Sequence, residues 1–209
     1  MKRITAYVLA LVLACSCAVS MAGAYTDVPG GSALAGEVEK AVSYGLMNGY
    51  SQDRFGYSDA MTRAQFVVVL TRMMGWQTPS DEETAASITA AMALPKNLSS
   101  QYRSAIACAA AHDVIGQSEA FRPNSPATRA EMAEMLVRAL GLKSCAADAE
   151  KENSLPFTDV SDKKGYIAVA YEIGMTKGLT DTTFAPDRTA TRAQAAAMLV
   201  RIYEKLHQQ

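Results

Sequence analysis

The chain has 209 residues, with 20 Lys and Arg against 21 Asp and Glu, and 49% of its residues are hydrophobic. This composition is typical of a folded globular protein, and the charge balance gives no electrostatic basis for binding nucleic acid. Two His, four Cys and one Trp leave little material for a metal centre or a His-based catalytic site. We therefore expect neither an enzyme nor a protein with a metal or cofactor.

The N-terminal segment 1–24 has the features of a secretory signal. Two basic residues precede an apolar run over 4–14, and small residues occupy 22–24. The run is shorter than the roughly 20 residues that a membrane-spanning helix needs. We expect cleavage after residue 24 and an exported protein with no remaining transmembrane span. Lipid attachment at Cys15 or Cys17 is the less favoured alternative, because a bulky residue stands where such signals usually carry a small one.

Two cysteines remain after this cleavage, Cys108 and Cys145. An exported pair of cysteines can oxidise to a disulfide. Cys108 also lies in the Ala-rich run 105–111, where it would serve equally well as a small buried residue. The sequence leaves both interpretations open.

Three segments align without gaps and reveal an internal repeat: 62–65 and 191–194 read Thr-Arg-Ala-Gln, and 128–131 reads Thr-Arg-Ala-Glu. Each tetrad has Phe seven residues before its Thr, Leu eight residues after it and Arg ten residues after it. The matching residues are Phe55, Phe121, Phe184, Leu70, Leu136, Leu199, Arg72, Arg138 and Arg201. The tetrads lie 66 and 63 residues apart, so three units account for the chain after residue 24.

Each unit predicts two helices joined by a glycine-containing loop, with the second helix starting at the Thr of the tetrad. The expected organisation is repeat one at 25–76, a linker at 77–97, repeat two at 98–142, a linker at 143–156 and repeat three at 157–209. An additional short helix is expected at 83–92 in the first linker. We predict an all-α fold in which three helix-loop-helix repeats, each a helical hairpin, share one core.

The tetrads have the pattern of capping boxes, in which a Thr hydroxyl and a Gln or Glu three residues later satisfy the first N–H groups of a helix. The predicted pairs are Thr62 with Gln65, Thr128 with Glu131, and Thr191 with Gln194. The Arg after each Thr is unexpected, because a cation in the first turn opposes the helix dipole and costs about 0.3–1 kcal/mol. Its presence in all three repeats indicates a shared task.

An anion would explain Arg63, Arg129 and Arg192, since free N–H groups at a helix start and a guanidinium together bind carboxylate or phosphate. The structural alternative is that each Arg pairs with a carboxylate of a neighbouring repeat, such as Asp27 or Asp159. The second Arg column lies mid-helix and is interpreted as a solvated face or an inter-repeat salt bridge.

Repeats one and three also open with related elements, Tyr-Thr-Asp-Val at 25–28 and Phe-Thr-Asp-Val at 157–160. Together with the tetrads, these elements resemble the S-layer homology family, whose repeats open with aromatic-x-Asp-Val and close with Thr-Arg-Ala-Glu or Thr-Arg-Ala-Gln. The resemblance covers nearly all of the chain after residue 24. It implies three repeats arranged with pseudo-threefold symmetry around a central helical bundle, with grooves between neighbouring repeats.

The resemblance also implies a function. In that family the grooves bind secondary cell-wall polysaccharide, often bearing ketal-linked pyruvate, and so anchor exported proteins to peptidoglycan at the cell surface without covalent bonds. By this resemblance Arg63, Arg129 and Arg192 contact the anion, and Asp27 and Asp159 contact sugar hydroxyls or orient the Arg. Other surface-layer proteins are further expected partners. The alternative is a structural adaptor or surface-layer assembly module that binds another protein.

Repeat two departs from the family pattern. Leu-Pro-Lys-Asn stands at 94–97 in place of the Asp-Val element, and His112 and Asp113 replace the glycine found at Gly45 and Gly174. These departures weaken the expectation of a working groove at that end of repeat two.

Overall fold

The computed structural model describes residues 25–77, 82–116, 121–152 and 155–207. The expected signal at 1–24, with its two cysteines, lies outside these residues. The described ranges contain helices and isolated bridges but no strand. The helices are α2 (Ala35–Ser43), α3 (Arg63–Met73), α4 (Glu82–Ala91), α5 (Ser100–Ala111), α6 (Arg129–Ala139), α7 (Lys143–Glu152), α8 (Lys164–Glu172) and α9 (Arg192–His207). None of these described helices is long and apolar enough to cross a membrane.

The second helix of each repeat begins directly after the Thr of its tetrad. The Thr62 hydroxyl accepts from Gln65 N at 3.3 Å, and the Gln65 side chain accepts from Thr62 N at 3.0 Å. Equivalent reciprocal bonds form in the other repeats. The bond to the Thr hydroxyl measures 3.2 Å in both, and the bond to the Glu or Gln side chain measures 2.9 Å in repeat two and 3.2 Å in repeat three. Each tetrad therefore satisfies two N–H groups at its helix start.

Both expected linkers contain a helix. α4 lies where a short helix was expected, but α7 was not expected. α7 packs against α8, and the two backbones approach closely at Gly165, where an added Cβ would overlap the carbonyl of Ala146. Gly165 therefore allows α7 to lie directly on α8.

The helices pack between repeats. α2 of repeat one packs against α9 of repeat three, α5 of repeat two against α3 of repeat one, and α8 of repeat three against α6 of repeat two. The first helix of each repeat thus lies on the second helix of the preceding repeat, counted cyclically. The expected hairpins, in which the two helices of one repeat pack together, are wrong in this respect.

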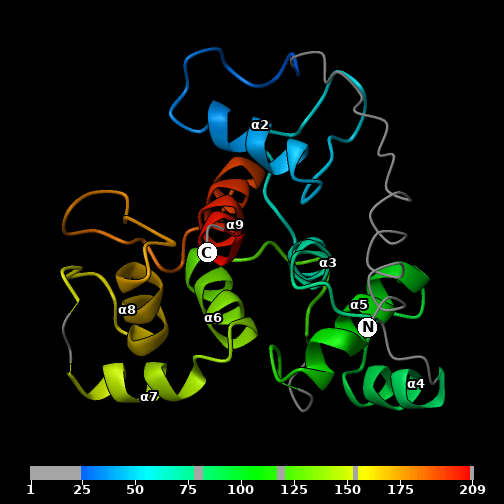
Figure 1. Cartoon of the computed structure of the whole chain (residues 1–209). Helices are drawn as coiled ribbons and strands as arrows, with labels where there is room; N and C mark the ends of the chain where they lie inside the picture. The colour runs from blue at the N-terminus through cyan, green and yellow to red at the C-terminus, as the bar shows by residue number, and fades with distance from the viewer. Residues whose placement is uncertain (1–24, 78–81, 117–120, 153–154, 208–209) are drawn as a thin grey trace, which may run out of the picture.

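The segments that precede the tetrads meet in a closed ring of main-chain hydrogen bonds. Met61 N donates to Ala190 O at 3.1 Å, Ala190 N to Ala127 O at 3.1 Å, and Ala127 N to Met61 O at 2.8 Å. Figure 1 shows α3, α6 and α9 in the middle of the view, with α2 above, α7 and α8 at the lower left, and α4 and α5 at the lower right. The cyclic bonding agrees with the threefold arrangement that the resemblance implies, and the symmetry of the whole bundle stays a prediction.

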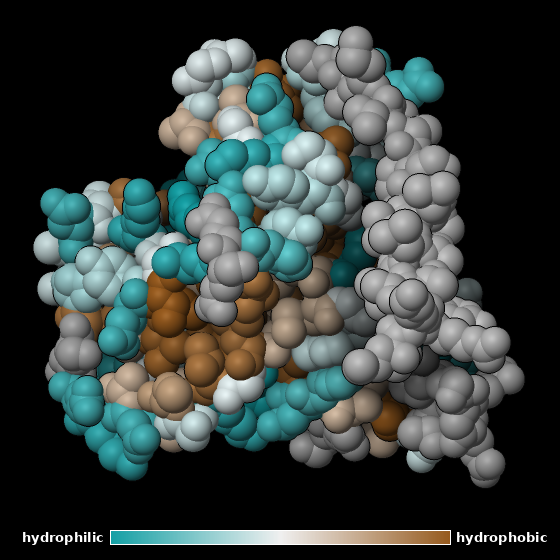
Figure 2. Space-filling view, viewed as in Figure 1, coloured by the Kyte–Doolittle hydropathy of each residue, from teal (hydrophilic) through white to brown (hydrophobic). Residues whose placement is uncertain are grey.

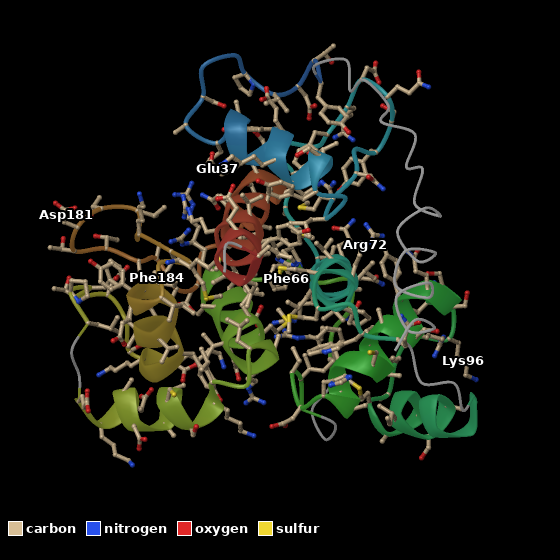
Figure 3. All side chains as sticks on the ribbon, viewed as in Figure 1. Glu37, Phe66, Arg72, Lys96, Asp181 and Phe184 are labelled. Atoms are coloured by element: carbon tan, nitrogen blue, oxygen red, sulfur yellow. The ribbon has the colours of Figure 1, made fainter. Side chains whose placement is uncertain are left out.

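The core is formed by the apolar residues that the three repeats share. The Leu at tetrad position plus eight is fully buried in each repeat, and so are Phe55 and Phe184. Figure 3 shows Phe66 between α3 and α9, and Arg72 on the other side of α3. On the face shown in Figure 2, apolar side chains gather over α6 and α8, with hydrophilic residues above and to the left of them.

Cys108 and Cys145 are not bonded to each other in the structure. Cys108 is buried in α5, where its thiol donates to the carbonyl of Gln77 at 3.4 Å, while Cys145 is exposed on α7. Burial raises the pKa of the Cys108 thiol. Cys108 is thus placed as the small buried residue of the second interpretation.

Candidate functional site

Asp27 and Asp159 bind main-chain N–H groups of the loop that precedes the tetrad in their own repeat. Asp27 Oδ1 accepts from Phe55 N at 2.7 Å, and Oδ2 accepts from the next two N–H groups at 2.7 and 2.9 Å. Asp159 accepts from Phe184 N at 2.9 Å and from Ala185 N at 2.7 Å. Desolvation would raise the pKa of both carboxyl groups, but these donors outweigh it and hold each pKa below the ordinary value of 3.8. The two carboxylates therefore fix the loop backbone.

Arg192 donates hydrogen bonds to carbonyls of the loop that Asp27 binds. Its Nε donates to Phe55 O at 3.0 Å, and its Nη2 donates to Asn48 O at 2.8 Å. The guanidinium lies 4.3 Å from the Tyr50 ring centroid and 5.0 Å from that of Phe55, and Arg192 is 5% exposed. Among the described residues, Asp27 and Arg192 thus bind the N–H and the carbonyl of the same residue, Phe55, without a hydrogen bond between their own side chains.

Arg129 repeats part of this arrangement in the loop that Asp159 holds. Its Nε donates to Phe184 O at 2.8 Å, and its guanidinium lies 4.6 Å from the Phe184 ring centroid. Its Nη2 is buried and has no hydrogen-bond partner among the described residues. Leu179 stands where repeat one has Tyr50. Desolvation, together with the nearby Arg188, lowers the pKa of Arg129 below its ordinary value.

Arg63 has a different partner. Its Nε donates to Glu131 Oε2 at 3.1 Å, and its Nη2 pairs with Oε1 of the same carboxylate. The carboxylate belongs to repeat two, so Arg63 follows the structural alternative of an inter-repeat ion pair. Desolvation would raise the pKa of Glu131, but the hydrogen bonds from Arg63 and the Thr128 amide, together with the nearby cations, outweigh it and lower that pKa. Among the described residues, neither Arg129 nor Arg192 forms a salt bridge within 4.0 Å.

The first N–H groups of the three second helices are not free, which corrects the expectation of anion sites built on helix starts. Arg63 N donates to Ser125 O at 3.0 Å, and Ala64 N donates to Pro123 O at 3.0 Å. The corresponding bonds elsewhere are Arg129 N to Arg188 O, Ala130 N to Pro186 O, Arg192 N to Asp59 O and Ala193 N to Tyr57 O. These N–H groups join neighbouring repeats, so an anion must be held by side chains or by other amides.

One cleft, of about 280 Å3, is formed by all three repeats, and we name it the Arg192 cleft. It is lined by the loop and α3 of repeat one, by the start of α5 of repeat two and by Arg192 of repeat three. The polar and aromatic residues of its lining include Tyr50, Gln65, Arg72, Gln101 and Tyr102. Two of its lining residues are cationic, and none carries a carboxylate.

A second cleft, of about 240 Å3, occupies the corresponding place one repeat further along, and we name it the Arg63 cleft. The cations in its lining are Arg63, Arg122, Arg138 and Lys163, and the carboxylates are Glu131 and Glu134. Glu134 accepts from Arg138 at 2.9 Å and from Lys163 at 2.7 Å. The cations outnumber the carboxylates by two, so this cleft also has a positive lining.

The Arg column at tetrad position plus ten binds main-chain carbonyls in the turn that follows the first helix of its own repeat, a role that the sequence analysis missed. Arg72 Nη1 donates to Leu46 O at 3.3 Å, and Arg201 Nη1 donates to Met175 O at 3.3 Å. Arg138 Nη1 makes a longer bond of 3.5 Å to Asp113 O, one residue earlier in the turn of repeat two. The recurrence of this Arg in all three repeats was the sequence signal for such a role. Nothing in the sequence pattern marked Tyr50 or Lys163 as cleft residues.

The comparison with known families identifies this repeat. The S-layer homology domain model matches residues 24–67, 96–133 and 156–196, and each match contains one tetrad. The chain belongs to the S-layer homology domain family. The three matches confirm three tandem S-layer homology repeats, one for each tetrad.

Several curated proteins share this S-layer homology region. An endoglucanase from Bacillus sp. (strain KSM-635) is 31% identical over 171 residues, which cover 77% of this chain and 17% of the relative. The S-layer protein EA1 of Bacillus anthracis is 29% identical over 185 residues, which cover 87% of this chain and 20% of the relative. A cellulosome-anchoring protein of Acetivibrio thermocellus is 35% identical over 89 residues, which cover 41% and 20%. The chain matches only a fifth or less of each of these relatives, so their whole activities do not transfer to it.

Proposed function

We propose that this S-layer homology domain anchors a protein to the bacterial cell wall by binding acidic secondary cell-wall polysaccharide in the Arg192 and Arg63 clefts. Family membership supports this, as do relatives named as an S-layer protein and a cellulosome-anchoring protein. The cell surface is accordingly the proposed location. The proposed anion is the carboxylate of a ketal-linked pyruvate on the polysaccharide.

The observation that carries the proposal is the seating of Arg192. Two of its nitrogens are held by main-chain carbonyls, and the rings of Tyr50 and Phe55 lie within 5.0 Å of the guanidinium. These contacts fix the guanidinium before any ligand arrives. Among the described residues Nη1 has no protein hydrogen bond, so it is available to a ligand in the cleft that Arg192 lines. A preorganised cation binds an anion with little loss of side-chain entropy.

The rest of the Arg192 cleft is suited to a sugar. Tyr50 and Tyr102 offer apolar ring faces with hydroxyl groups, and Gln65 and Gln101 offer amide donors and acceptors for ring hydroxyls. Its volume of about 280 Å3 is just below the roughly 300–1,000 Å3 of sites that hold drug-sized ligands. The cleft is therefore of a size for one modified monosaccharide of a longer chain.

Cosedimentation with purified cell-wall sacculi tests this function. We expect the chain from Tyr25 onward to sediment with intact sacculi, and the double variant Arg63→Gln with Arg192→Gln to remain in the supernatant. The variant removes the Arg192 guanidinium from one cleft and leaves the Glu131 carboxylate without its Arg63 partner in the other, where it repels an anion. Lys151→Gln is the matched control, because Lys151 is an exposed cation on α7 that lines neither cleft. Circular dichroism and thermal melting confirm that each variant is folded.

Sacculi stripped of their acid-labile polymer distinguish the proposal from the adaptor alternative. We expect stripping to abolish sedimentation of the wild-type chain. Undiminished binding to stripped sacculi would contradict polysaccharide recognition and favour a protein or bare peptidoglycan as the partner.

A further inference from the structure

Repeat two lacks the carboxylate that holds the loop in repeats one and three. The opening turns of repeats one and two are equivalent, because Val28 N donates to Tyr25 O at 3.2 Å and Leu98 N donates to Pro95 O at 3.1 Å. This equivalence places Asn97 at the position of Asp27. Repeat two therefore has an uncharged side chain where the other repeats have an aspartate.

The loop that this aspartate would hold borders the Arg63 cleft in repeat two. Phe121 and Arg122 correspond to Phe55 and Gly56, whose amides bind Asp27. Phe121 and Arg122 both line the Arg63 cleft, whereas neither Phe55 nor Gly56 lines the Arg192 cleft. Among the described residues, no carboxylate accepts from the amide of Phe121 or Arg122. The Arg63 cleft thus extends to a part of the loop that an aspartate covers in repeats one and three.

We propose that the carboxylate of the acidic sugar takes the place of the missing aspartate in the Arg63 cleft and accepts hydrogen bonds from the N–H groups of Phe121 and Arg122. The inference rests on the proposed function and specifies which groups of this cleft bind the carboxylate of the ligand. Equivalent amides bind Asp27 and Asp159 at 2.7 to 2.9 Å, so the same loop sequence position already binds carboxylate twice in this fold.

The charge of the cleft favours the same position. Arg122 belongs to the loop itself, and Arg63, Arg138 and Lys163 line the same cleft, so cations exceed carboxylates by two. Arg138 and Lys163 are engaged by Glu134, and Arg63 by Glu131. Among the described residues Arg122 has no carboxylate partner, so the incoming carboxylate meets this unpaired cation, and the two amides supply direct hydrogen bonds. The two clefts thus hold the acidic group differently, the Arg192 cleft by a guanidinium and the Arg63 cleft by main-chain amides.

The amide resonances of the 15N-labelled chain from Tyr25 to the C-terminus test this binding mode. The probe is a methyl hexopyranoside carrying a pyruvate ketal, and the control is the corresponding acetone ketal, which has the same rings but no carboxylate. We expect the pyruvate ketal to shift the amides of Phe121 and Arg122 downfield in a saturable way, and the acetone ketal to leave them unchanged.

The variant Asn97→Asp supplies the missing carboxylate from the protein. We expect it to shift the same two amides without ligand and to weaken probe binding at the Arg63 cleft roughly tenfold, because the probe must displace a bound carboxylate. Binding at the Arg192 cleft is expected to be unchanged. Asn97→Ser is the matched neutral control and keeps the wild-type affinity. If Asn97→Asp leaves the two amides unshifted, the new carboxylate does not reach them. The inference then stands or falls with the wild-type titration and its acetone ketal control.

The outcomes separate this inference from the proposed function. Saturable binding at both clefts without any shift of Phe121 and Arg122 would overturn the inference and leave the proposed function standing. Binding at neither cleft would overturn the proposed function and the inference with it.

Discussion

At the scale of single residues, Asp27 and Asp159 stabilise the loops on which the Arg side chains rest. Each carboxylate accepts at least two main-chain hydrogen bonds at 2.7 to 2.9 Å. A carboxyl group whose pKa is lower in the folded than in the unfolded chain stabilises the fold above its unfolded pKa, and this stabilisation is lost as pH falls through the folded pKa. The loops are therefore expected to loosen in acid, below the ordinary carboxyl value of 3.8.

Replacement of Asp27 tests this role. We expect Asp27→Asn to lower the free energy of unfolding at pH 7 by about 1–3 kcal/mol, because hydrogen bonds to a charged group become weaker or are lost. Urea unfolding at pH 7 and pH 3 should show a smaller difference between variant and wild type at pH 3. Asp181→Asn, at an exposed aspartate of the corresponding loop in repeat three, is the control and should have little effect (Figure 3). An equal loss at both pH values would show that the charge of Asp27 is irrelevant.

The residue pattern predicted only part of the site. The three tetrad Arg were recognised because a cation in the first helical turn opposes the dipole. Their partners were not predictable, because Glu131, the Phe55 carbonyl and the Phe184 carbonyl approach from other repeats. The hydrogen bonds between Asp27 and the loop amides could not be predicted from residue spacing either, since Asp27 and Phe55 lie 28 residues apart in the chain.

At the scale of helices, the sequence predicted the elements with a strong apolar pattern and missed the one without it. α3, α6 and α9 begin where the capping boxes predict. α7 was missed because Ala146 is its one fully buried residue among those described, so 143–152 has no apolar stripe that distinguishes a helix from a linker. Its close approach to α8 depends on Gly165, which a pattern of apolar residues does not show.

Gly165→Ala tests the packing of α7 on α8. We expect it to destabilise the protein by about 1–3 kcal/mol, because the new methyl group would overlap the carbonyl of Ala146. Gly36→Ala in α2 is the matched control, since nothing lies within 4 Å of the position of its added Cβ. In a helix this control should be neutral or stabilising, by up to about 1 kcal/mol. Thermal melts of both variants would contradict the account if Gly165→Ala proved as stable as Gly36→Ala.

At the scale of the whole molecule, the repeats depend on one another. α2 of repeat one packs on α9 of repeat three, and α8 of repeat three packs on α6 of repeat two. The sequence predicted three units but paired the helices within each unit, because local spacing carries no information on which distant helix covers an apolar face. The ring of hydrogen bonds through Met61, Ala127 and Ala190 closes only when all three repeats are present.

A two-repeat fragment should therefore fail to fold cooperatively. Removal of residues 157–209 takes away the partners of α2 and α6, and the fragment cannot bury their apolar faces. We expect the chain from Tyr25 to the C-terminus to unfold in one transition, and the 25–156 fragment to lack both a cooperative transition and near-ultraviolet circular dichroism. A fragment that melts cooperatively near the temperature of the longer chain would show that the repeats are independent.

The most direct test of the central claim is a calorimetric titration of the chain with solubilised wall polysaccharide, before and after mild acid removes its pyruvate ketals. The account predicts saturable binding to the intact polymer, loss of that binding after removal of the ketals, and strong weakening by Arg192→Gln in a variant that remains folded. Equal affinity for the intact and the pyruvate-free polymer would contradict the claim that the clefts recognise an acidic group on the cell wall.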